Sequence, residues 1–380
     1  MYDLFDYGAM LAHRARTDAY AQAVGRAVKP GDIVVEIGCG PGLFSLLACR
    51  AGARRVYAIE STDSVAFARE LILANECAGK IQLLHGYSMR LNLPERANVI
   101  LSDIRGTLPL RGDAVVSIED ARRRFLAPGG VMIPEVDRLY VALVSAPEYY
   151  ASVVSPWRES DHGACLSPLL KRVLNSACSV SFESERIMSQ SVLWCELDYR
   201  TGVHQGAAAS LDLKASRNGV AHGLCLWFDT TLLGDIGYSA APGQPDNVYG
   251  QLFLPWCEPV ELEAGQPVLI ELHADHVGDD YIWRWISRFP AGNGAPERVF
   301  SQSTLEGARF TPAVLLRRSA GFVPRLSESA TAESWVMQRM DGTMSLQEIA
   351  AEALARFPSV LRNSEEALQL VSRLADKFAQ

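Results

Sequence analysis

The sequence lacks the patterns that mark membrane and secreted proteins. It contains no run of about 18 apolar residues, so no transmembrane helix is predicted. The chain begins Met1-Tyr2-Asp3, which is acidic where a secretory signal peptide is basic and then apolar. We therefore expect a cytoplasmic protein with no membrane partner.

Spacings typical of metal sites are also missing. The eight cysteines are scattered, and no two have the CxxC spacing. The chain is long and has no export signal, so free and mostly buried thiols in a reducing compartment are expected rather than disulfides. His273 and His276 form an isolated HxxH in a strand-like segment, a pattern found more often in packing than in metal binding. We predict no metal site.

Basic residues are fewer than acidic ones, 36 Lys and Arg against 44 Asp and Glu, which gives a net charge of −8. This balance argues against a nucleic-acid partner, because such proteins usually present a positive face. Hydrophobic residues make up 48% of the chain, as in ordinary globular proteins. At about 150 residues per domain, the 380 residues predict two or three domains.

Residues 1–136 alternate short apolar runs with helical patterns. Strands are expected at 33–37, 56–59, 81–84, 99–101 and 131–133, and helices at 6–28, 43–50, 63–75 and 118–126. Nearly continuous apolar strands that alternate with helices are typical of a parallel sheet covered on both faces. We predict an α/β domain with a Rossmann-like parallel sheet in residues 1–136.

The pattern changes after residue 137. Further strands are expected at 139–144, 191–195, 224–231, 267–272 and 281–285. Short strands separated by Gly, Pro, Asn and Asp turns predict an antiparallel β-barrel or sandwich over 137–300. A Gly- and Pro-rich loop is expected at 290–296, and residues 310–380 form a small helical domain.

The most informative motif is Glu36-Ile37-Gly38-Cys39-Gly40-Pro41-Gly42, which stands between the first strand and the first helix of the parallel sheet. Glycines let the backbone turn tightly and approach a ligand closely. Glu60 closes the next strand, where a carboxylate can accept hydrogen bonds from a ribose. A structural strand-to-helix turn is the alternative interpretation of the motif, but the strand, loop, helix and acid together favour a nucleotide site.

Two details favour S-adenosylmethionine (SAM) over a dinucleotide. The dinucleotide fingerprint GxGxxG requires a third glycine where this chain has Leu43. A carboxylate at Glu36 would repel a pyrophosphate, whereas SAM has no phosphate and carries a positive sulfonium. We predict SAM as the cofactor.

The residues around this motif resemble the protein arginine methyltransferase family. The likeness covers Met10-Leu11, Arg16 to Tyr20, the glycine motif, and the stretch from Ala51 to Glu60. It continues through Phe125-Leu126-Ala127-Pro128-Gly129-Gly130 and extends over about 1–290. The resemblance implies that Arg16 binds the SAM carboxylate, and that Glu36, Gly38, Gly40 and Gly42 surround the methionine and ribose. It also implies that Glu60 binds the ribose hydroxyls, that the substrate is a peptide or protein, and that the chain forms a homodimer.

The chain departs from this family where the acceptor binds. The family uses two glutamates to hold the guanidinium, but here the first position is Asp103 and the second is Gly112. Arg105 and Arg111 add positive charge, and Asn247-Val248-Tyr249 replaces the family's Thr-His-Trp stretch. A neutral nucleophile, or a carboxylate attracted by Arg105 or Arg111, is therefore expected as the acceptor. Asp103 and Arg105 are the candidate catalytic residues, although a purely structural Asp103 and a solvated Arg105 remain an equal alternative.

The C-terminal segment resembles the PqqD-type small winged-helix domains that hold the leader of a ribosomally made precursor peptide. The likeness rests on Asp341-Gly342, the capping box of Ser345 with Glu348, and Arg356-Phe357-Pro358. Asn363 with Glu366 has the spacing of a second cap. The resemblance implies that an extended leader peptide adds to a sheet edge. A helical appendage that only packs against the rest of the chain is the alternative.

Together these observations predict a SAM-dependent methyltransferase that transfers a methyl group to an N or O nucleophile of a ribosomally made peptide. Two alternatives remain open at this point. One is protein arginine N-methylation, and the other is a non-catalytic scaffold that binds a peptide.

Overall fold

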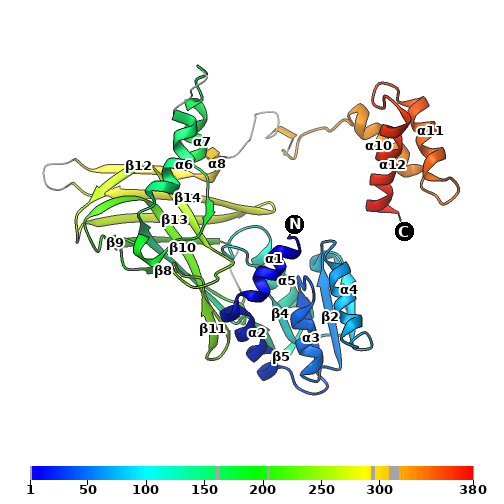
Figure 1. Cartoon of the computed structure of the whole chain (residues 1–380), viewed down its shortest axis with the longest axis horizontal. Coiled ribbons are helices and arrows are strands. Elements are labelled where there is room, and N and C mark those ends of the chain that lie inside the picture. The colour runs from blue at the N-terminus through cyan, green and yellow to red at the C-terminus, as the bar shows by residue number, and fades with distance from the viewer. Residues whose placement is uncertain are drawn as a thin grey trace. The chain divides into compact units, whose positions relative to one another are not determined.

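The computed structural model of the chain describes residues 2–158, 163–202, 206–291, 296–307, 316–317 and 319–379 (Figure 1). The chain divides into two compact units, residues 1–308 and 309–380. The larger unit contains a parallel sheet with helices and, after it, two antiparallel sheets. The predicted α/β fold class is confirmed.

The parallel sheet has the strand order β3-β2-β1-β4-β5. Its strands are β1 (Ile33–Ile37), β2 (Arg55–Glu60), β3 (Ile81–His85), β4 (Ala97–Ser102) and β5 (Leu126–Ile133). The helices between them are α3 (Leu43–Arg50), α4 (Val65–Ala74) and α5 (Ala114–Phe125), with a short 3₁₀ turn η1 (Ser88–Arg90). β1 is the central strand, and four of its five residues are buried because helices cover both faces. All the predicted strands of this half are present.

The N-terminal segment differs from the single helix expected at 6–28. It forms two helices, α1 (Leu4–Ala12) and α2 (Arg14–Ala27), which meet at His13. Neither Gly nor Pro stands at this junction, so no local breaker marks it in the sequence. His13 is 1% exposed, and its ring packs edge-on against Tyr238 and Tyr249. Tertiary packing of His13 therefore accounts for the break.

The antiparallel half follows β5. One sheet has the order β7-β12-β10-β6-β8, with β11 paired to β10, and the other has the order β15-β14-β13-β9. The first sheet comprises β6 (Val136–Val144), β7 (Cys178–Val180), β8 (Val192–Asp198), β10 (Gly219–Leu233), β11 (Ile236–Ser239) and β12 (Gln251–Leu262). The second comprises β9 (Gly206–Lys214), β13 (Pro267–Val277), β14 (Asp280–Phe289) and β15 (Arg298–Ser303). Buried tryptophans join the two sheets, since Trp194 Nε1 donates to the Leu272 carbonyl and Trp256 Nε1 donates to Ser287 Oγ.

Several elements of this half were not predicted. A helical insertion lies between β6 and β7, with α6 (Pro147–Arg158), η2 (Ser167–Leu169) and α7 (Leu170–Leu174), and it projects from the antiparallel sheets in Figure 1. β7, β9, β11, β12 and β15 were also missed, as were the short turns η3 (Ser184–Arg186) and α8 (Thr304–Gly307). Part of the loop predicted at 290–296 lies outside the described residues, which omit 292–295.

The C-terminal unit contains α10 (Glu328–Gln338), α11 (Leu346–Arg356) and α12 (Ser364–Phe378). Its own apolar core includes Val336, Ile349 and Val371. The capping box of Ser345 and Glu348 opens α11 as predicted, and the Asn363 side chain caps α12. The described residues of this unit include no strand, so the sheet edge expected for a leader peptide is not among them.

All eight cysteines lie in described segments and are free thiols. Cys39, Cys49, Cys77 and Cys225 are buried, and the others are partly or fully exposed. No helix in the described segments has the length and apolar character needed to cross a membrane.

Candidate functional site

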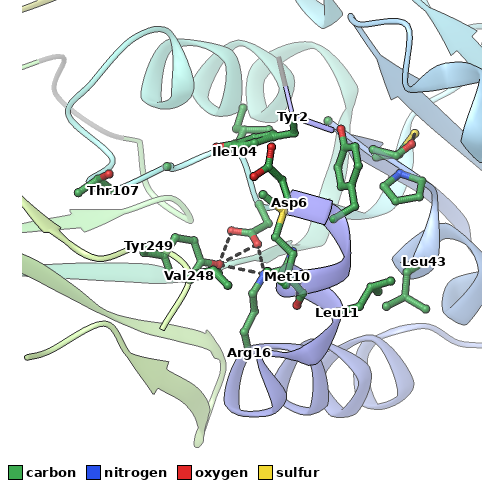
Figure 2. Close-up of a pocket in the computed structure, with 18 of the residues that line it drawn as sticks. Tyr2, Asp6, Met10, Leu11, Arg16, Leu43, Ile104, Thr107, Val248 and Tyr249 are labelled. Carbon is green, nitrogen blue, oxygen red and sulfur yellow. Dashed lines mark hydrogen bonds and ion pairs between the residues drawn. The ribbon is translucent and has the colours of Figure 1, made fainter. Parts of the chain in front are cut away.

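A cavity of about 760 Å³ lies where the carboxyl ends of the parallel strands meet the antiparallel half. Its volume is in the range of small-molecule sites. One end is lined by the glycine motif and by Glu60, and the other by Thr107, Val180 and Val248. Arg16 and Tyr249 also line the cavity (Figure 2), and Asp103 is hydrogen-bonded to both of them. The arrangement can hold a nucleotide-like ligand at one end and a second molecule at the other.

The glycine motif forms the floor of the first end. Gly38 has a φ of +71°, and a Cβ there would lie 2.3 Å from Ile104 Cγ2. Gly40 has a φ of +52°, and its Cβ would lie 2.9 Å from the Tyr7 ring of α1. Gly42 (φ +87°) is the N-cap of α3 and faces Ala68, so it shapes the turn without lining the cavity. A side chain at Gly38 or Gly40 is disfavoured for two reasons. The backbone has a positive φ at both positions, and a neighbouring side chain lies too close to the Cβ position.

Glu36 projects from β1 into this end of the cavity. Its carboxyl group is 2% exposed and accepts a hydrogen bond from Ser45 Oγ on α3. Burial raises the pKa of Glu36 to about 8, although the hydrogen bond from Ser45 opposes the shift. Glu36 therefore gains or loses a proton near neutral pH, unlike an exposed glutamate.

Glu60 at the end of β2 supports the glycine loop directly. Its Oε2 accepts the Gly40 N–H at 2.9 Å, and its Oε1 accepts the Thr62 N–H and the Thr62 hydroxyl, both at 2.8 Å. A carboxylate offers about four acceptor positions. One position remains for a ligand hydroxyl at this edge of the cavity.

Arg16 on α2 is the only basic side chain among the described residues that line the cavity. Its Nε donates to Asp103 Oδ2 at 2.5 Å and to Tyr249 Oη at 3.1 Å, and its Nη1 donates to the Met10 carbonyl. The guanidinium also lies 5.1 Å from the Phe44 ring centroid. A guanidinium has five N–H donors, so Arg16 keeps donors for a carboxylate ligand while it holds Asp103.

Asp103 follows β4, and its side chain is only 6% exposed. Oδ1 accepts from Arg105 Nη2 at 3.0 Å and from Tyr249 Oη at 2.9 Å, while Oδ2 accepts from Arg16 and Tyr249. Burial alone would raise the pKa of Asp103. The charges of Arg16 and Arg105 and the Tyr249 hydrogen bond more than offset burial and hold this pKa at about 2. Both oxygens are therefore committed to donors of the chain itself.

Arg105 lies behind Asp103 and does not line the cavity. Its side chain is fully buried, and it donates to Asp137, Thr230, Tyr20, Tyr238 and Asp103. Arg16, Arg105, Asp103 and Asp137 thus form a buried cluster with two charges of each sign. A buried guanidinium is tolerated only when it is paired in this way, which explains why Arg105 is not free to contact an acceptor.

Gly112 and Arg111, two further residues singled out at the acceptor end, also lie outside the cavity wall. Gly112 donates its N–H to Asp280, and no atom lies within 4 Å of the position that a Cβ would take there. Arg111 Nη1 donates to Ser179 Oγ at 3.0 Å, and Ser179 in turn lines the cavity. The basic groups that were expected to attract a carboxylate acceptor therefore do not face the cavity directly.

Three tyrosines at this site were not predicted as site residues. Tyr249 Oη contacts Asp103, Arg16 and Tyr238, and Tyr238 and Tyr20 both accept from Arg105. The sequence carries a signal for Tyr249, because this residue stands in the segment that replaces Thr-His-Trp. Tyr20 on α2 ends the Arg16–Tyr20 stretch that carries the resemblance, whereas nothing in the sequence neighbourhood of Tyr238 on β11 points to the site.

The residues at the first end suit SAM better than a phosphate-bearing nucleotide. The acidic side chains of Glu36 and Glu60 would be unfavourable next to an anionic pyrophosphate. They can instead accept hydrogen bonds from an amino group or from ribose hydroxyls, and they suit a positively charged sulfonium. The N–H donors left on Arg16 match the carboxylate of the methionine moiety. Within the described residues, no group of three or more His, Cys, Asp or Glu is placed to hold a metal ion.

Two family models match consecutive parts of the chain. Residues 13–134 match the ribosomal protein L11 methyltransferase (PrmA) model, and residues 136–278 match the arginine methyltransferase oligomerization subdomain. The boundary between the two matches falls between β5 and β6, where the parallel sheet gives way to antiparallel strands.

Solved structures agree with this division. The Trypanosoma brucei PRMT1 enzyme-prozyme heterotetrameric complex with AdoHcy matches with a TM-score of 0.72 at 20% identity, over 78% of this chain and 97% of that one. Arabidopsis thaliana protein arginine methyltransferase 10 matches with a TM-score of 0.69 at 23% identity, over 79% of this chain and 97% of that one. The chain has the arginine methyltransferase fold.

Curated relatives carry related names. A probable protein arginine N-methyltransferase 6 of Arabidopsis thaliana is 32% identical over 236 residues, 59% of this chain and 54% of that protein. A probable histone-arginine methyltransferase CARM1 of Oryza sativa subsp. indica is 31% identical over 313 residues, 78% of this chain and 59% of that protein. The chain therefore spans little more than half the length of these relatives.

Proposed function

We propose that the protein is a SAM-dependent methyltransferase that transfers a methyl group to an N or O nucleophile of a peptide or protein. The observation that carries this proposal is the single cavity that joins the Glu36–Glu60 end to the Asp103–Tyr249 end. SAM supplies an activated methyl group, so the protein mainly has to bring the acceptor into line with it.

Each part of the cavity has a separate task in this proposal. Arg16 binds the methionine carboxylate with donors that Asp103 leaves free. Glu60 accepts a ribose hydroxyl, and Gly38 and Gly40 let the loop approach the cofactor. Asp103 holds Arg16 and Tyr249 in place beside the acceptor end, and Arg105 is a positioning residue that fixes Asp103 from behind.

Calorimetry with S-adenosylhomocysteine (SAH) tests the cofactor assignment. Glu60→Gln and Glu60→Ala should weaken SAH binding about 10-fold or more, because a charge-assisted hydrogen bond to the ribose is lost. Glu70→Ala is the matched control, since Glu70 is exposed on α4 and does not line the cavity. Undetectable SAH binding by the unmodified chain would overturn the assignment.

Arginine N-methylation is the second candidate, favoured by the names of the relatives and by the match to the arginine methyltransferase oligomerization subdomain. Against it stand the commitment of both Asp103 oxygens to donors of the chain and the absence of a glutamate at Gly112. Methyl transfer to arginine peptides but not to the same peptides with lysine or serine would establish this candidate. SAH binding without turnover on any acceptor would instead favour a peptide-binding scaffold.

We further propose a division of the chain into a SAM-binding domain (1–136), a substrate domain (137–300) and a PqqD-like domain (310–380) that binds the leader of a ribosomally made precursor. The separate core of α10, α11 and α12 supports an independent binding module. Incubation with SAM and a precursor peptide encoded beside the gene should add a mass of one or more methyl groups. The same core peptide without its leader should react more slowly.

A homodimer is part of this proposal. Its support is the match of residues 136–278 to an oligomerization subdomain. Sedimentation equilibrium should give twice the mass of the chain.

A further inference from the structure

The strand β7 forms an edge of the first antiparallel sheet and borders the acceptor end of the cavity. It stands at the end of the strand order and pairs only with β12. Ser179, Val180 and the following residue Ser181 all line the cavity. Ser179 and Ser181 are exposed, whereas Val180 is half-buried. An exposed strand edge presents backbone N–H and C=O groups that can pair with another chain.

The direction of the β7 backbone follows from its partner strand β12. Gln302 Nε2 donates to the Pro255 carbonyl of β12 and to the Leu174 carbonyl before β7, so the Pro255 carbonyl points to the β7 side of β12. In an antiparallel ladder, successive residues point their backbone groups to opposite sides. Phe253 and Gln251, two and four residues before Pro255, therefore point toward β7.

The residues of β7 alternate in the same way. Val180 pairs with Gln251, so it directs its backbone groups toward β12. A Cβ at Gly250 would lie 2.9 Å from the Val180 carbonyl oxygen, which agrees with this direction. Ser179 and Ser181 therefore turn their N–H and C=O groups away from β12, and no backbone hydrogen bond to another described element uses these groups. They are available to a second chain beside the cavity.

A basic group contacts the side chain of Ser179. Arg111 Nη1 donates to Ser179 Oγ at 3.0 Å, and Thr107 Oγ1 lies 2.8 Å from the same atom. Arg111 is exposed and makes no ion pair with a described residue. Side chains directly opposite each other on paired strands lie about 5 Å apart. A carboxylate opposite Ser179 would therefore meet the Arg111 guanidinium.

We propose that β7 binds the peptide that carries the methyl acceptor as an added strand, and that this peptide has an acidic side chain opposite Ser179. Addition of a strand to a sheet edge is a recurring mode of peptide recognition. The backbone hydrogen bonds hold the peptide at the acceptor end, and the charge of Arg111 selects its sequence. The inference rests on the proposed methyltransferase function and defines the conformation and charge of its peptide substrate.

NMR titration of hexapeptides into the SAH-loaded full chain tests the added strand. The probe is acetyl-TSEVTS-amide, and two analogues carry N-methyl groups on alternate backbone nitrogens, one at the odd and one at the even positions. Only alternate N–H groups of a strand face its neighbour. One analogue should therefore bind about 10-fold more weakly than the probe, and the other about as tightly as the probe. Equal affinities of the two analogues, or no binding of the probe, would overturn the inference.

Ser179→Pro tests the same edge from the side of the protein. Proline removes the outward N–H of Ser179 but no ladder hydrogen bond, so β7 can still form at the sheet edge. Ser179→Ala is the matched control, because it loses the same hydroxyl and keeps the N–H. Ser179→Pro should bind the probe about 10-fold more weakly than Ser179→Ala, and equal affinities would contradict the added strand. If Ser179→Pro does not fold, the two methylated analogues decide.

Arg111→Gln tests the preference for an acidic side chain. It should weaken binding of the probe about fivefold, because an exposed ion pair is lost, and leave binding of the analogue with Gln in place of Glu unchanged. Arg69→Gln on α4 is the matched control, because Arg69 is exposed and does not line the cavity. Equal losses for the two peptides, or for the two variants, would overturn the acidic preference. Failure of SAH to bind would instead overturn the proposed function, so the two failures are distinguishable.

Discussion

Asp103 is more constrained than its place at a strand end indicates. Its carboxylate lies between the guanidinium groups of Arg16 and Arg105, and Tyr249 donates to it as well. The charged form of the Asp103 carboxylate stabilises the folded chain, because these interactions are absent in the unfolded chain. Asp103 therefore has a stability role that is separate from any contact with an acceptor.

Asp103→Asn should destabilise the larger unit by about 3–5 kcal/mol at pH 7, because two buried guanidinium groups lose a charged partner. The pKa of Asp103 is lowered from 3.8 to about 2, so its charge contributes roughly 2 kcal/mol above pH 3.8 and loses this contribution as the pH falls toward 2. Urea unfolding at pH 7 and at pH 2.5 measures both effects. A difference between variant and unmodified chain that stays constant over this range would contradict the prediction.

The burial of His13 predicts a second pH dependence of stability, on the acidic side of neutrality. Both its ring nitrogens are buried without hydrogen-bond partners among the described residues. Burial lowers the pKa of His13, and the charge of Arg16 lowers it further. The unfolded chain therefore binds this proton more readily, and stability should fall as the pH drops below about 6.5. His13→Phe should remove that loss, which unfolding at pH 8 and pH 5 measures, with His85→Phe on β3 as the control.

At the scale of elements, α1 and the glycine loop are in direct contact. The Tyr7 ring lies against Gly40, so the first helix and the cofactor loop share a contact surface. Part of the cavity wall is therefore set by residues about thirty positions apart in the chain.

Gly40→Ala should weaken SAH binding about 10-fold, because the new Cβ would lie 2.9 Å from Tyr7 and the φ of +52° is unfavourable for alanine. Gly106→Ala is the control, because Gly106 also lines the cavity and has a similar positive φ of +57°, but no atom within 4 Å of its Cβ position. Calorimetry on both variants separates the effect of backbone strain from the effect of the contact. Equal losses in the two would show that the Tyr7 contact is unimportant.

The elements also show what a sequence can and cannot predict here. β1 and α3 have the predicted bounds, because an apolar run and a glycine turn define them locally. β12 was missed because it contains Pro255 and Pro259, and prolines are unfavourable inside a strand. The structure places Pro255 opposite Gly223, next to a shift of register between Ala221 and Gly223. Such a pairing depends on a partner strand that the local sequence does not reveal.

The sequence predicted the glycine-motif end of the site better than the acceptor end. Glu36, Gly38, Gly40 and Glu60 lie on one wall of the cavity, as a strand, loop and helix pattern implies, and their roles toward SAM stay predictions. Arg105 was predicted to meet the acceptor, but its buried partner Asp137 stands 32 residues away on a strand of the other half. No local pattern predicts that pairing, because it forms only when the segment that follows β4 contacts β6.

At the scale of the whole molecule, the two compact units have separate apolar cores. Val371→Ala in the core of the C-terminal unit should lower its stability by about 2 kcal/mol or more. The same change should leave SAH affinity within twofold of the unmodified chain, because no described residue of this unit lines the cavity. Scanning calorimetry should show one transition moving to lower temperature and the other unchanged. A shift of both transitions would mean that the units unfold together.

The Arg105 contacts have a consequence for how such proteins can recombine. Arg105 belongs to the parallel-sheet half, while Asp137, Thr230 and Tyr238 belong to the antiparallel half. In a chimera of two related proteins joined between β5 and β6, the first parent supplies the residue at position 105. The second parent supplies its partners at positions 137, 230 and 238. Parents that differ at these positions should give insoluble products, while exchange of the four residues as a set should restore a soluble chain. The junction that looks simplest in the sequence is therefore the one where both parents must match.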